Sequence, residues 1–557
     1  MPSRNWRVLA SLVVLVLLTA CRGGSDGFVS GPTAQITLQA QFEKKPMTPG
    51  GPGAITLRPA RYCWAEVRDA GSNALLASGY LGSDGTGTAL VPQGLSIYVQ
   101  VFAQFQVPSA DPNSFFQRGS VKNAPLPTSA VSLSAFSAIP VWSVTGATVL
   151  ADRDGTLSVT ALASNRIAGA FNIADQAVTF SAAVRDMDAT TTLRLPNLHS
   201  FWTTSTSPVD QARTYPALTY SSATTYLVSD SGRALFSHGL YGLSGGASTE
   251  TDEWDDGVLQ ETFARLLFAD STYKADGSSS LSLLRRDNDN VWVDRAVQSE
   301  STAAFVAGFS DFLSAAIRND SRILDSYVDA GGTARVDLFD LTDHTFVPAT
   351  AKGEFSRGSI AISLWGLWKN VLGGGQTGLK TLWAAARSAT PYLDGTGEYE
   401  QATLGCFPTY LQGVYSRVTA PTWSTALSEL SLEAIPNPNA AYFAGTALWN
   451  TRPIGFSETG SLQTYGSTWY YDRNQGQAWR FTHSGGTRTI AMTPTSGQDF
   501  YLEVLGPGGW VAGSYNNPGS TRTLTLTGLP AGVYAARVRA SLADTSGGLN
   551  TYTISVN

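Results

Sequence analysis

The sequence predicts an α+β multidomain protein, with a β-sandwich at each end of the chain and a mostly helical domain between them. Apolar and polar residues alternate between residues 34 and 105 and again in the last hundred residues, which is typical of half-buried strands. Between about 250 and 435 the apolar residues instead recur at helical spacing. With 557 residues, 43% of them apolar, the chain can bury several cores, and we expect three or four domains.

The charge and the scarcity of metal-binding side chains exclude several classes of protein. Lys and Arg number 37 against 43 Asp and Glu, and no run of basic residues of the kind that binds nucleic acid is present. The chain has 3 Cys and 4 His, whereas one structural zinc site takes about four such ligands. Disulfide scaffolds and zinc fingers are therefore excluded, and no nucleic-acid partner is expected.

The first 20 residues have the pattern of a signal peptide, because Arg4 and Arg7 precede an apolar run over 8–20 that is too short to cross a bilayer. The end of this run, Leu18-Thr19-Ala20-Cys21, resembles the lipobox of bacterial lipoproteins. This resemblance implies cleavage before Cys21, acylation of its thiol and anchoring to a membrane of the bacterial cell envelope, facing the periplasm or the cell exterior. Residues 21–33, rich in Gly and Ser, then form the lipidated tether.

Residues 34–105 are expected to form a small antiparallel β-sandwich. Its strands are marked by Ile36, Leu38, Ala40 and Phe42, by Cys63, Ala65 and Val67, and by Ile97, Val99 and Val101. The stretch 83–94, which reads turn, strand, turn, resembles the transthyretin-like, carboxypeptidase-regulatory type of domain found in secreted bacterial proteins. That resemblance implies a spacer or a contact module for sugars and proteins.

The middle of the chain changes from a mixed to a helical pattern. Residues 106–245 are expected to be a mixed α+β region, with short strands at 156–162 and 177–184. In residues 246–455, apolar stripes predict three helices, over 258–267, 305–317 and 360–372. Gly373-Gly374-Gly375 is expected to end the third helix, because glycine readily takes the left-handed cap conformation.

Residues 456–557 return to the strand pattern. Alternation predicts strands at Phe500–Val504, Leu524–Leu526, Tyr534–Val538 and Tyr552–Val556. The segment 529–534, Leu-Pro-Ala-Gly-Val-Tyr, resembles the signature of the pre-peptidase C-terminal β domain that is common on secreted bacterial proteases.

This order of domains on a lipoprotein signal resembles a group of bacterial secreted zinc metallopeptidase-like lipoproteins. The most specific stretch is 251–256, Thr-Asp-Glu-Trp-Asp-Asp, followed by the helix 258–268. In that family a D-E-[YW]-D run leads into a helix bearing H-E-[FW]-G-H, and later helices carry E-G-[WF] and S-E-x-S-V. Two His one helical turn apart bind one zinc ion, the Glu beside the first His polarises the attacking water, and the Glu of the second helix completes the ligands.

The zinc-binding side chains of the family are missing from this sequence. The H-E-x-G-H positions read Gln260 to Ala264 without a gap, or Glu261 to Arg265 with the one-residue shift that fits the flanking pattern better. Neither register supplies a His. Ala307 stands at the ligand glutamate and Arg357 at the outer glutamate. The resemblance therefore implies former metal and catalytic positions at Gln260, Glu261, Ala264, Arg265, Ala307 and Arg357 that no longer function, and a fold without zinc.

We accordingly expect a lipid-anchored pseudoenzyme that binds an extracellular peptide, protein or glycan. In the shifted register Glu261 and Arg265 are spaced i, i+4, so they form either a salt bridge in the former zinc space or an ordinary solvated pair. The alternative is an active metal-dependent peptidase or other hydrolase with a rebuilt site.

Three further features leave alternatives open. A rebuilt metal site would draw on the remaining histidines and on neighbouring acids: His199, His238, His344, His483, Asp252, Glu253 and Asp255. The run 287–290, Asp-Asn-Asp-Asn, with Asp294, is either a weak calcium site or a solvated loop. Cys63 and Cys406 are either two lone buried thiols or a disulfide between domains.

Overall fold

The computed structural model describes most of the chain between residue 31 and the C-terminus. The described residues are 31–109, 115–124, 137–188, 197–202, 232–235, 249–250, 252–271, 295–296, 301–328, 333–354, 356–389, 407–435, 437, 452–464, 476–495, 500–506, 509–514, 519–540 and 548–557. Cys21 with the expected signal peptide, Cys406, His238 and the acidic run 287–290 with Asp294 lie outside them.

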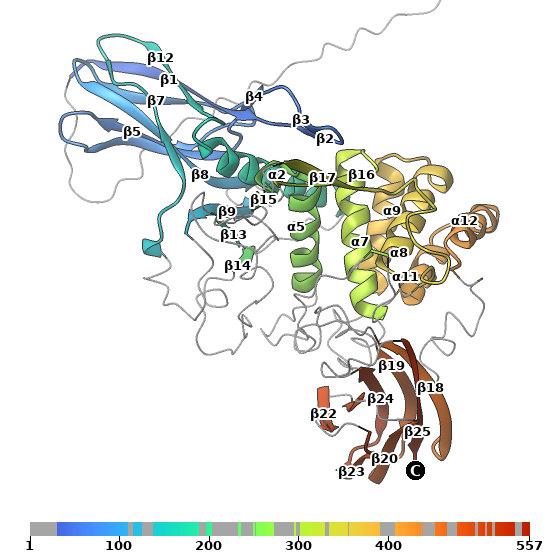
Figure 1. Ribbon diagram of the computed structural model, residues 1–557. Helices are drawn as coiled ribbons and strands as arrows, with labels where there is room; N and C mark the ends of the chain where they lie inside the picture. The colour runs from blue at the N-terminus through green and yellow to red at the C-terminus, as the bar shows by residue number, and fades with distance from the viewer. Residues whose placement is uncertain are drawn as a thin grey trace, which may run out of the picture.

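The first sheet of the N-terminal sandwich is built around β1 (Thr33–Lys44; Figure 1). Buried residues alternate with more exposed ones along this strand. Three strands pair with it: β4 (Thr56–Pro59), β7 (Thr86–Pro92) and β12 (Gly155–Ala161). β4 and β7 run antiparallel to β1, but β12 runs parallel to it. The sandwich therefore takes a strand from beyond residue 105, and it is not purely antiparallel.

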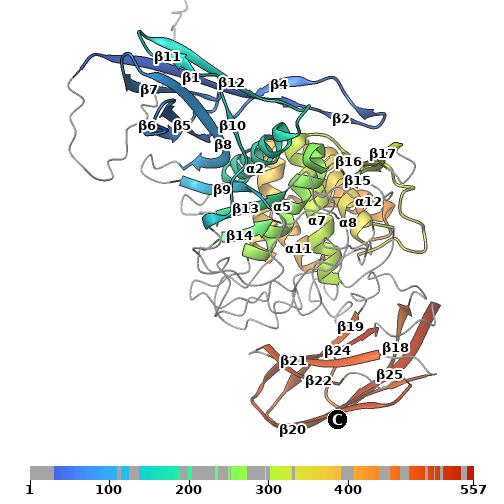
Figure 2. The same ribbon diagram turned by 60° about the vertical axis from the view of Figure 1, so that its left-hand side comes forward.

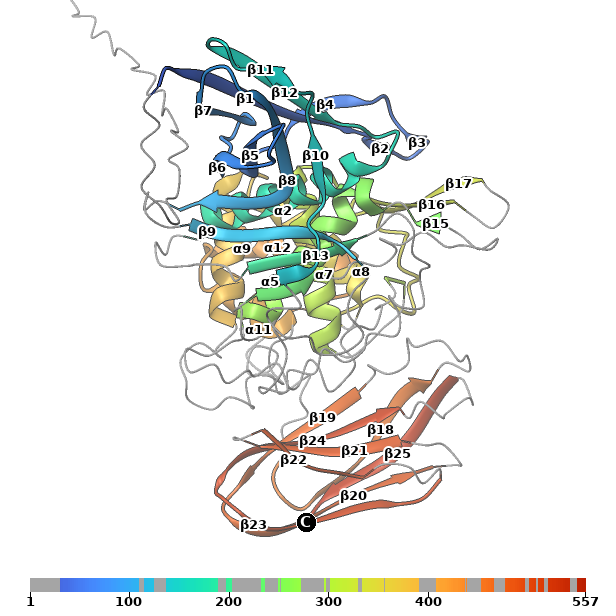
Figure 3. The same cartoon turned by 90° about the vertical axis from the view of Figure 1, so that its left-hand side faces the viewer.

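The second sheet is built around β8 (Ser96–Pro108), whose inward residues Ile97 to Val107 are buried. The other strands of this sheet are β5 (Cys63–Asp69), β6 (Leu75–Tyr80), β9 (Phe115–Asn123), β10 (Ser143–Thr145), β11 (Val149–Leu150), β13 (Asn197–Trp202) and β14 (Gly232–Leu235). Figure 3 shows β8, β9 and β13 lying in front of the helices. This sheet thus connects the sandwich to the helical domain.

Helix α2 (Ile167–Met187) corrects one expectation from the sequence, because residues 177–184 are helical and not a strand. α2 packs against β1, β8 and β9 on one side and against helix α5 on the other. Burial on both sides, with small residues such as Ala170, Ala174 and Ala177 at the contacts, outweighs the weak strand preference of its Val, Thr and Phe residues. The strand expected at 156–162 is confirmed as β12.

The helical domain contains the three helices that the apolar stripes predict, in α5 (Asp256–Ser271), α7 (Ser301–Arg318) and α8 (Arg357–Gly366), the last continuing as a π-helical turn over Leu367–Val371. Gly373 and Gly374 have φ of 78° and 65°, which confirms the glycine cap. The remaining elements are the 3₁₀ turn Asp252–Trp254, α9 (Gln376–Ala389), α11 (Phe407–Tyr415), α12 (Ala420–Leu432), the sheet β15 (Thr249–Glu250), β16 (Arg322–Val328) and β17 (Ala334–Asp340), and the hairpin β2 (Met47–Thr48) and β3 (Gly51–Pro52).

The C-terminal residues form a second sandwich (Figure 2). This sandwich has its own hydrophobic core. One sheet has the strands β18 (Phe456–Thr464), β25 (Gly548–Val556), β20 (Gly486–Pro494) and β23 (Arg522–Leu529), and the other has β19 (Gly476–His483), β24 (Gly532–Ala540), β21 (Phe500–Gly506) and β22 (Gly509–Ser514). All four strands expected here are present. By contrast, the first sandwich and the helices share one continuous core.

The architecture is therefore α+β and multidomain, as the sequence predicts, with β-sandwiches at both ends and a mostly helical region between them. No helix of the described residues is both long and apolar enough to cross a membrane.

Gly119, in the middle of β9, provides a test of how the second sheet is packed. A methyl group there would come within 2.3 Å of the Leu198 carbonyl oxygen and of the Phe105 ring. We expect Gly119→Ala to lower the free energy of unfolding by about 1–3 kcal/mol or more, through overpacking. The control is Gly155→Ala in β12, where the nearest atom to the new methyl group lies at 3.9 Å. Its free energy of unfolding should stay within about 0.5 kcal/mol of the wild-type value. Urea denaturation measures both, and equal losses would contradict this packing.

Candidate functional site

Arg357 lies at the centre of the region where the sequence resemblance expects a metal site. It is the first residue of α8, after the N-cap Ser356, and its side chain is fully buried. Its Nε donates to Asp311 Oδ2 at 2.5 Å, and its Nη2 donates to Asp311 Oδ1 at 2.8 Å and to Glu261 Oε1 at 3.1 Å. One guanidinium group therefore connects helices α5, α7 and α8.

A second arginine, Arg295, also binds Asp311. The Nη2 of Arg295 lies 3.2 Å from Asp311 Oδ1, and Asp311 is completely buried. Burial opposes ionisation of this carboxyl, but the charges and hydrogen bonds of Arg295 and Arg357 outweigh it and lower its pKa to about 2. The carboxylate is therefore ionised at any physiological pH.

Among the other positions that the resemblance aligns with the metal site, only Glu261 has a described zinc-binding group. Gln260 is buried and donates its amide to Gln176 Oε1 of α2 at 2.7 Å. Ala264 and Ala307 are buried methyl groups without lone pairs. The side chain of Arg265 lies outside the described residues, and the carboxylate of Glu261 is bound by Arg357 of α8.

These side chains do not fit zinc in either register. A tetrahedral zinc site needs about three protein lone-pair donors, such as imidazole, thiolate or carboxylate. Only Glu261 supplies one among the positions described, and a guanidinium cation already binds it. The set can hold a buried ion network, but it is not a zinc ligand set.

A separate acidic group lies beside this network. Oxygens of Asp252, Asp255 and Asp325 lie within 4.8 Å of one another. Asp255 accepts hydrogen bonds from the backbone N–H of Ser326 at 2.6 Å and from its hydroxyl at 2.8 Å. Burial, followed by the charge of Asp325, raises the pKa of the Asp255 carboxyl well above its usual range. Three carboxylates this close need a shared proton or a nearby positive charge, and the charge of Arg295 already acts on Asp325.

The described histidines do not join this acidic group. His199 contacts the hydroxyl of Ser120 at 3.0 Å, and His344 contacts Glu433 Oε1 at 2.9 Å. His483 is buried in the C-terminal sandwich, where Arg488 donates to its Nδ1 at 2.9 Å. Among the described residues, the group of side chains close enough to share a cation contains carboxylates alone.

Cys63 is a free, buried thiol in β5, and burial raises its pKa. Such a thiol is chemically inert at neutral pH.

A cleft of about 510 Å³ opens on the other face of α5, between that helix, α2 and the first sheet. It is lined by basic and acidic side chains in similar number, with Gln260 among them. The sequence does not reveal this cleft, because its lining residues are far apart in the chain. They come from β1, β4, α2, α5, α7 and β16, among other segments.

No protein-family model and no curated protein matches the chain. Among solved structures, the pre-peptidase C-terminal domain of a Bacillus anthracis collagenase is 16% identical, with a TM-score of 0.15, over 19% of this chain and 92% of that domain. The Aeromonas hydrophila periplasmic inhibitor of g-type lysozyme is 15% identical, with a TM-score of 0.14, over 19% of this chain and 96% of that protein. A family 36 carbohydrate-binding module in complex with calcium and xylotriose is 11% identical, with a TM-score of 0.13, over 19% of this chain and 92% of that module. At these values none of them assigns a function to the chain.

The Arg357 network is expected to make a large contribution to stability. Arg357→Leu removes the cation that Asp311 and Glu261 share and should lower the free energy of unfolding by about 3–5 kcal/mol, as for other broken buried ion pairs. The control is Arg153→Leu, which removes an exposed arginine of the first sandwich and should change stability by less than about 0.5 kcal/mol. Chemical denaturation at pH 7 compares them, and similar stability of the two variants would contradict the role given to Arg357.

The lowered pKa of Asp311 also predicts a pH dependence. Because its pKa in the folded chain is about 2, below the ordinary 3.8, its contribution to stability is complete above about pH 4 and is lost as the pH falls toward 2. Between these values the free energy of unfolding should fall more steeply for wild type than for Asp311→Asn, which has no carboxyl to protonate. Denaturation curves from pH 5 to pH 2 test this, and parallel pH profiles would refute it.

Proposed function

We propose that the protein is a lipid-anchored binding protein of the bacterial cell envelope, with a central domain of metallopeptidase-like fold that has lost its zinc site and its peptidase activity. The binding partner in this proposal is an extracellular peptide, protein or glycan. The membrane is the second partner, through the acylated Cys21.

One observation above all supports the loss of zinc, namely the fully buried guanidinium of Arg357 between Asp311 and Glu261. A fixed positive charge beside Glu261 repels a divalent cation. The guanidinium also binds the carboxylate of Glu261, which is the one carboxylate that both alignments with the H-E-x-G-H motif include. Rebuilding a zinc site there would leave this arginine buried without its partners, at a cost of several kcal/mol.

The proposed location rests on the N-terminal sequence. The pattern Leu18-Thr19-Ala20-Cys21 follows a short apolar run and precedes a Gly- and Ser-rich segment that leads into β1. Acyl chains on Cys21 would hold the folded part of the protein at the membrane surface through this tether.

An alternative function, a metal-dependent hydrolase with a rebuilt site, is favoured by the acidic group of Asp252, Asp255 and Asp325. All-oxygen ligand sets of this kind suit hard cations such as calcium, magnesium or manganese and not zinc. The two functions therefore differ in the metal that they predict.

Metal analysis of the purified full-length protein separates these functions. After dialysis against trace zinc, we expect far less than one equivalent of bound zinc in wild type and no change in Glu261→Gln, because no zinc is held by Glu261. We also expect no hydrolysis of casein with or without added zinc. A known zinc peptidase, treated in parallel, controls for metal loss during dialysis. Stoichiometric zinc in wild type that falls in Glu261→Gln would overturn the proposal, whereas stoichiometric manganese or calcium with hydrolysis would favour the alternative.

A further inference from the structure

The cleft beside α5 has the size and the position of a ligand site. Its volume of about 510 Å³ falls in the range of small-molecule and short-peptide pockets. It lies between the first sandwich and the helical domain, with α2 and the N-terminal half of α5 forming its wall. The apolar part of its lining consists of Pro46, Met47, Pro59, Trp254 and Leu324.

Four cations and four carboxylates line the cleft, and two ion pairs form among them. The cations are Lys44, Arg58, Arg61 and Arg318, and the carboxylates are Asp175, Asp255, Asp256 and Asp320. Lys44 is bound to Asp256, and Arg61 to Asp175, whose Oδ1 lies 2.6 Å from the arginine Nε.

The other two carboxylates are bound by residues that do not line the cleft. Both oxygens of Asp320 accept hydrogen bonds from the guanidinium of Arg322, each at 2.9 Å. Both oxygens of Asp255 accept hydrogen bonds from Ser326. Arg58 and Arg318 are therefore the lining cations without a direct ion pair among the described residues, although the charges of Asp256 and Asp320 also act on Arg318.

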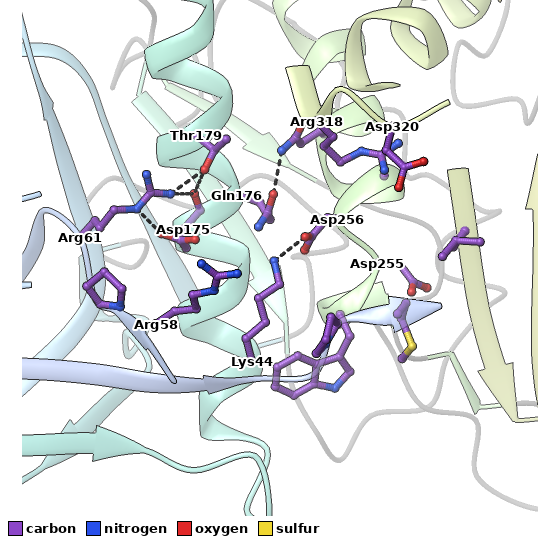
Figure 4. Close-up of a pocket in the computed structure, with 17 residues that line it drawn as sticks. Lys44, Arg58, Arg61, Asp175, Gln176, Thr179, Asp255, Asp256, Arg318 and Asp320 are labelled. Carbon is purple, nitrogen blue, oxygen red and sulfur yellow. Dashed lines mark hydrogen bonds and ion pairs between the residues drawn. The ribbon is translucent and has the colours of Figure 1, made fainter. Parts of the chain in front are cut away.

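Arg58 is an exposed side chain of β4 that points into the cleft (Figure 4). It is opposite Phe42 of β1, so it shares a face of the sheet with Lys44, two residues farther along that strand. Within the part of the chain that the structure describes, Arg58 has no ion-pair partner. Ordering a long arginine side chain costs conformational entropy, and no ion pair offsets this cost at Arg58. An anionic ligand would supply the missing partner.

Two buried polar atoms of the lining also have no partner among the described residues. They are Nε of Arg318, a hydrogen-bond donor, and Oε1 of Gln260, an acceptor. Arg318 is the last residue of α7, and its Nη2 lies 3.1 Å from where a Cβ of Gly257 in α5 would be. Gln260 is about one turn farther along α5 from Gly257. Burying such atoms unpaired costs about 1–3 kcal/mol each. A ligand that pairs both must carry an acceptor and a donor close together.

We propose that this cleft binds the C-terminal residue of a peptide, with its carboxylate held by Arg58 and Arg318 and its amide N–H donated to Gln260. Guanidinium groups bind carboxylates through paired, charge-assisted hydrogen bonds. The amide N–H of a C-terminal residue lies next to its carboxylate, so one residue supplies both the acceptor and the donor. Met47, Trp254 and Leu324 provide an apolar wall for its side chain.

Other anions match the cleft less well. Inorganic phosphate offers acceptors to the arginines and an O–H donor to Gln260, but it has no apolar group for the wall formed by Met47, Trp254 and Leu324. A sugar acid supplies donors but has no aliphatic group for the apolar wall. This inference rests on the proposed binding function for its biological role. Arg58 and Arg318 are separate from Arg357 and from the positions that the resemblance aligns with the metal site, whereas Gln260 is one of those positions.

Isothermal titration of the full-length protein tests the proposal with two peptides, acetyl-Gly-Ala-Leu with a free carboxylate and the same peptide with a C-terminal amide. We expect saturable binding of the free acid and at least tenfold weaker binding of the amide. Arg58→Gln and Arg318→Gln should each weaken binding of the acid about tenfold or more, and Gln260→Leu should weaken it as well. Arg153→Gln, an exposed arginine away from the cleft, is the matched control and should bind like wild type.

The outcomes separate this proposal from its rivals. Equal binding of acid and amide, absence of saturable binding, or unchanged affinity in Arg58→Gln would overturn it. Arg58 is exposed, so this variant stays informative even where Arg318→Gln lowers stability. Phosphate or glucuronate that binds as tightly as the peptide would also overturn it, in favour of an anion or sugar-acid site. Stoichiometric zinc with intact peptide binding would instead refute the proposed loss of the metal while leaving this site in place.

Discussion

The structure of the helical domain depends on one buried guanidinium, that of Arg357. Burying a charge is so costly that it persists only with close partners, and here Asp311 of α7 and Glu261 of α5 supply them. These partners fix the first turn of α8 against two other helices, and Gly308 allows α7 to approach it, since a Cβ there would lie 2.7 Å from the Arg357 carbonyl oxygen. Burial of the apolar stripes drives the three helices together. We infer that the ion network fixes their positions relative to one another.

The contact between the first sandwich and the helices follows the same rule. Helix α2 buries Asn172 and Gln176 among apolar residues, and each has its amide paired with α5 or the turn before it: Asn172 with the Glu253 carbonyl oxygen at 2.8 Å, and Gln176 with Gln260 at 2.7 Å. Such polar contacts within a continuous core specify one relative position of two layers.

The sequence predicts the helices and strands with strong periodicity, because spacing along the chain reports which face of an element is buried. It does not predict 177–184 correctly, since there packing on both sides overrides local preference. It also misses Asp311, Arg295 and Asp325, whose partners lie far away in the chain. Of these three residues, only Asp311 could have been noticed in the sequence. It lies on the face of α7 that otherwise carries Ala304, Ala307 and Gly308, and an acid on such a buried face needs a cation as its partner.

Asp311 lies one helical turn after Ala307, the position at which the resemblance expects a metal-binding glutamate. A carboxylate therefore lies on the same face of α7, one turn from that position, and its partners are arginines. An arginine is always charged, and Arg357 connects three helices at once, so this network supplies rigidity without a metal. The opposite face of α5, with Gly257 and Gln260, is not used by this network. A ligand in the proposed cleft would therefore pair Oε1 of Gln260 without breaking the ion pairs of Arg357.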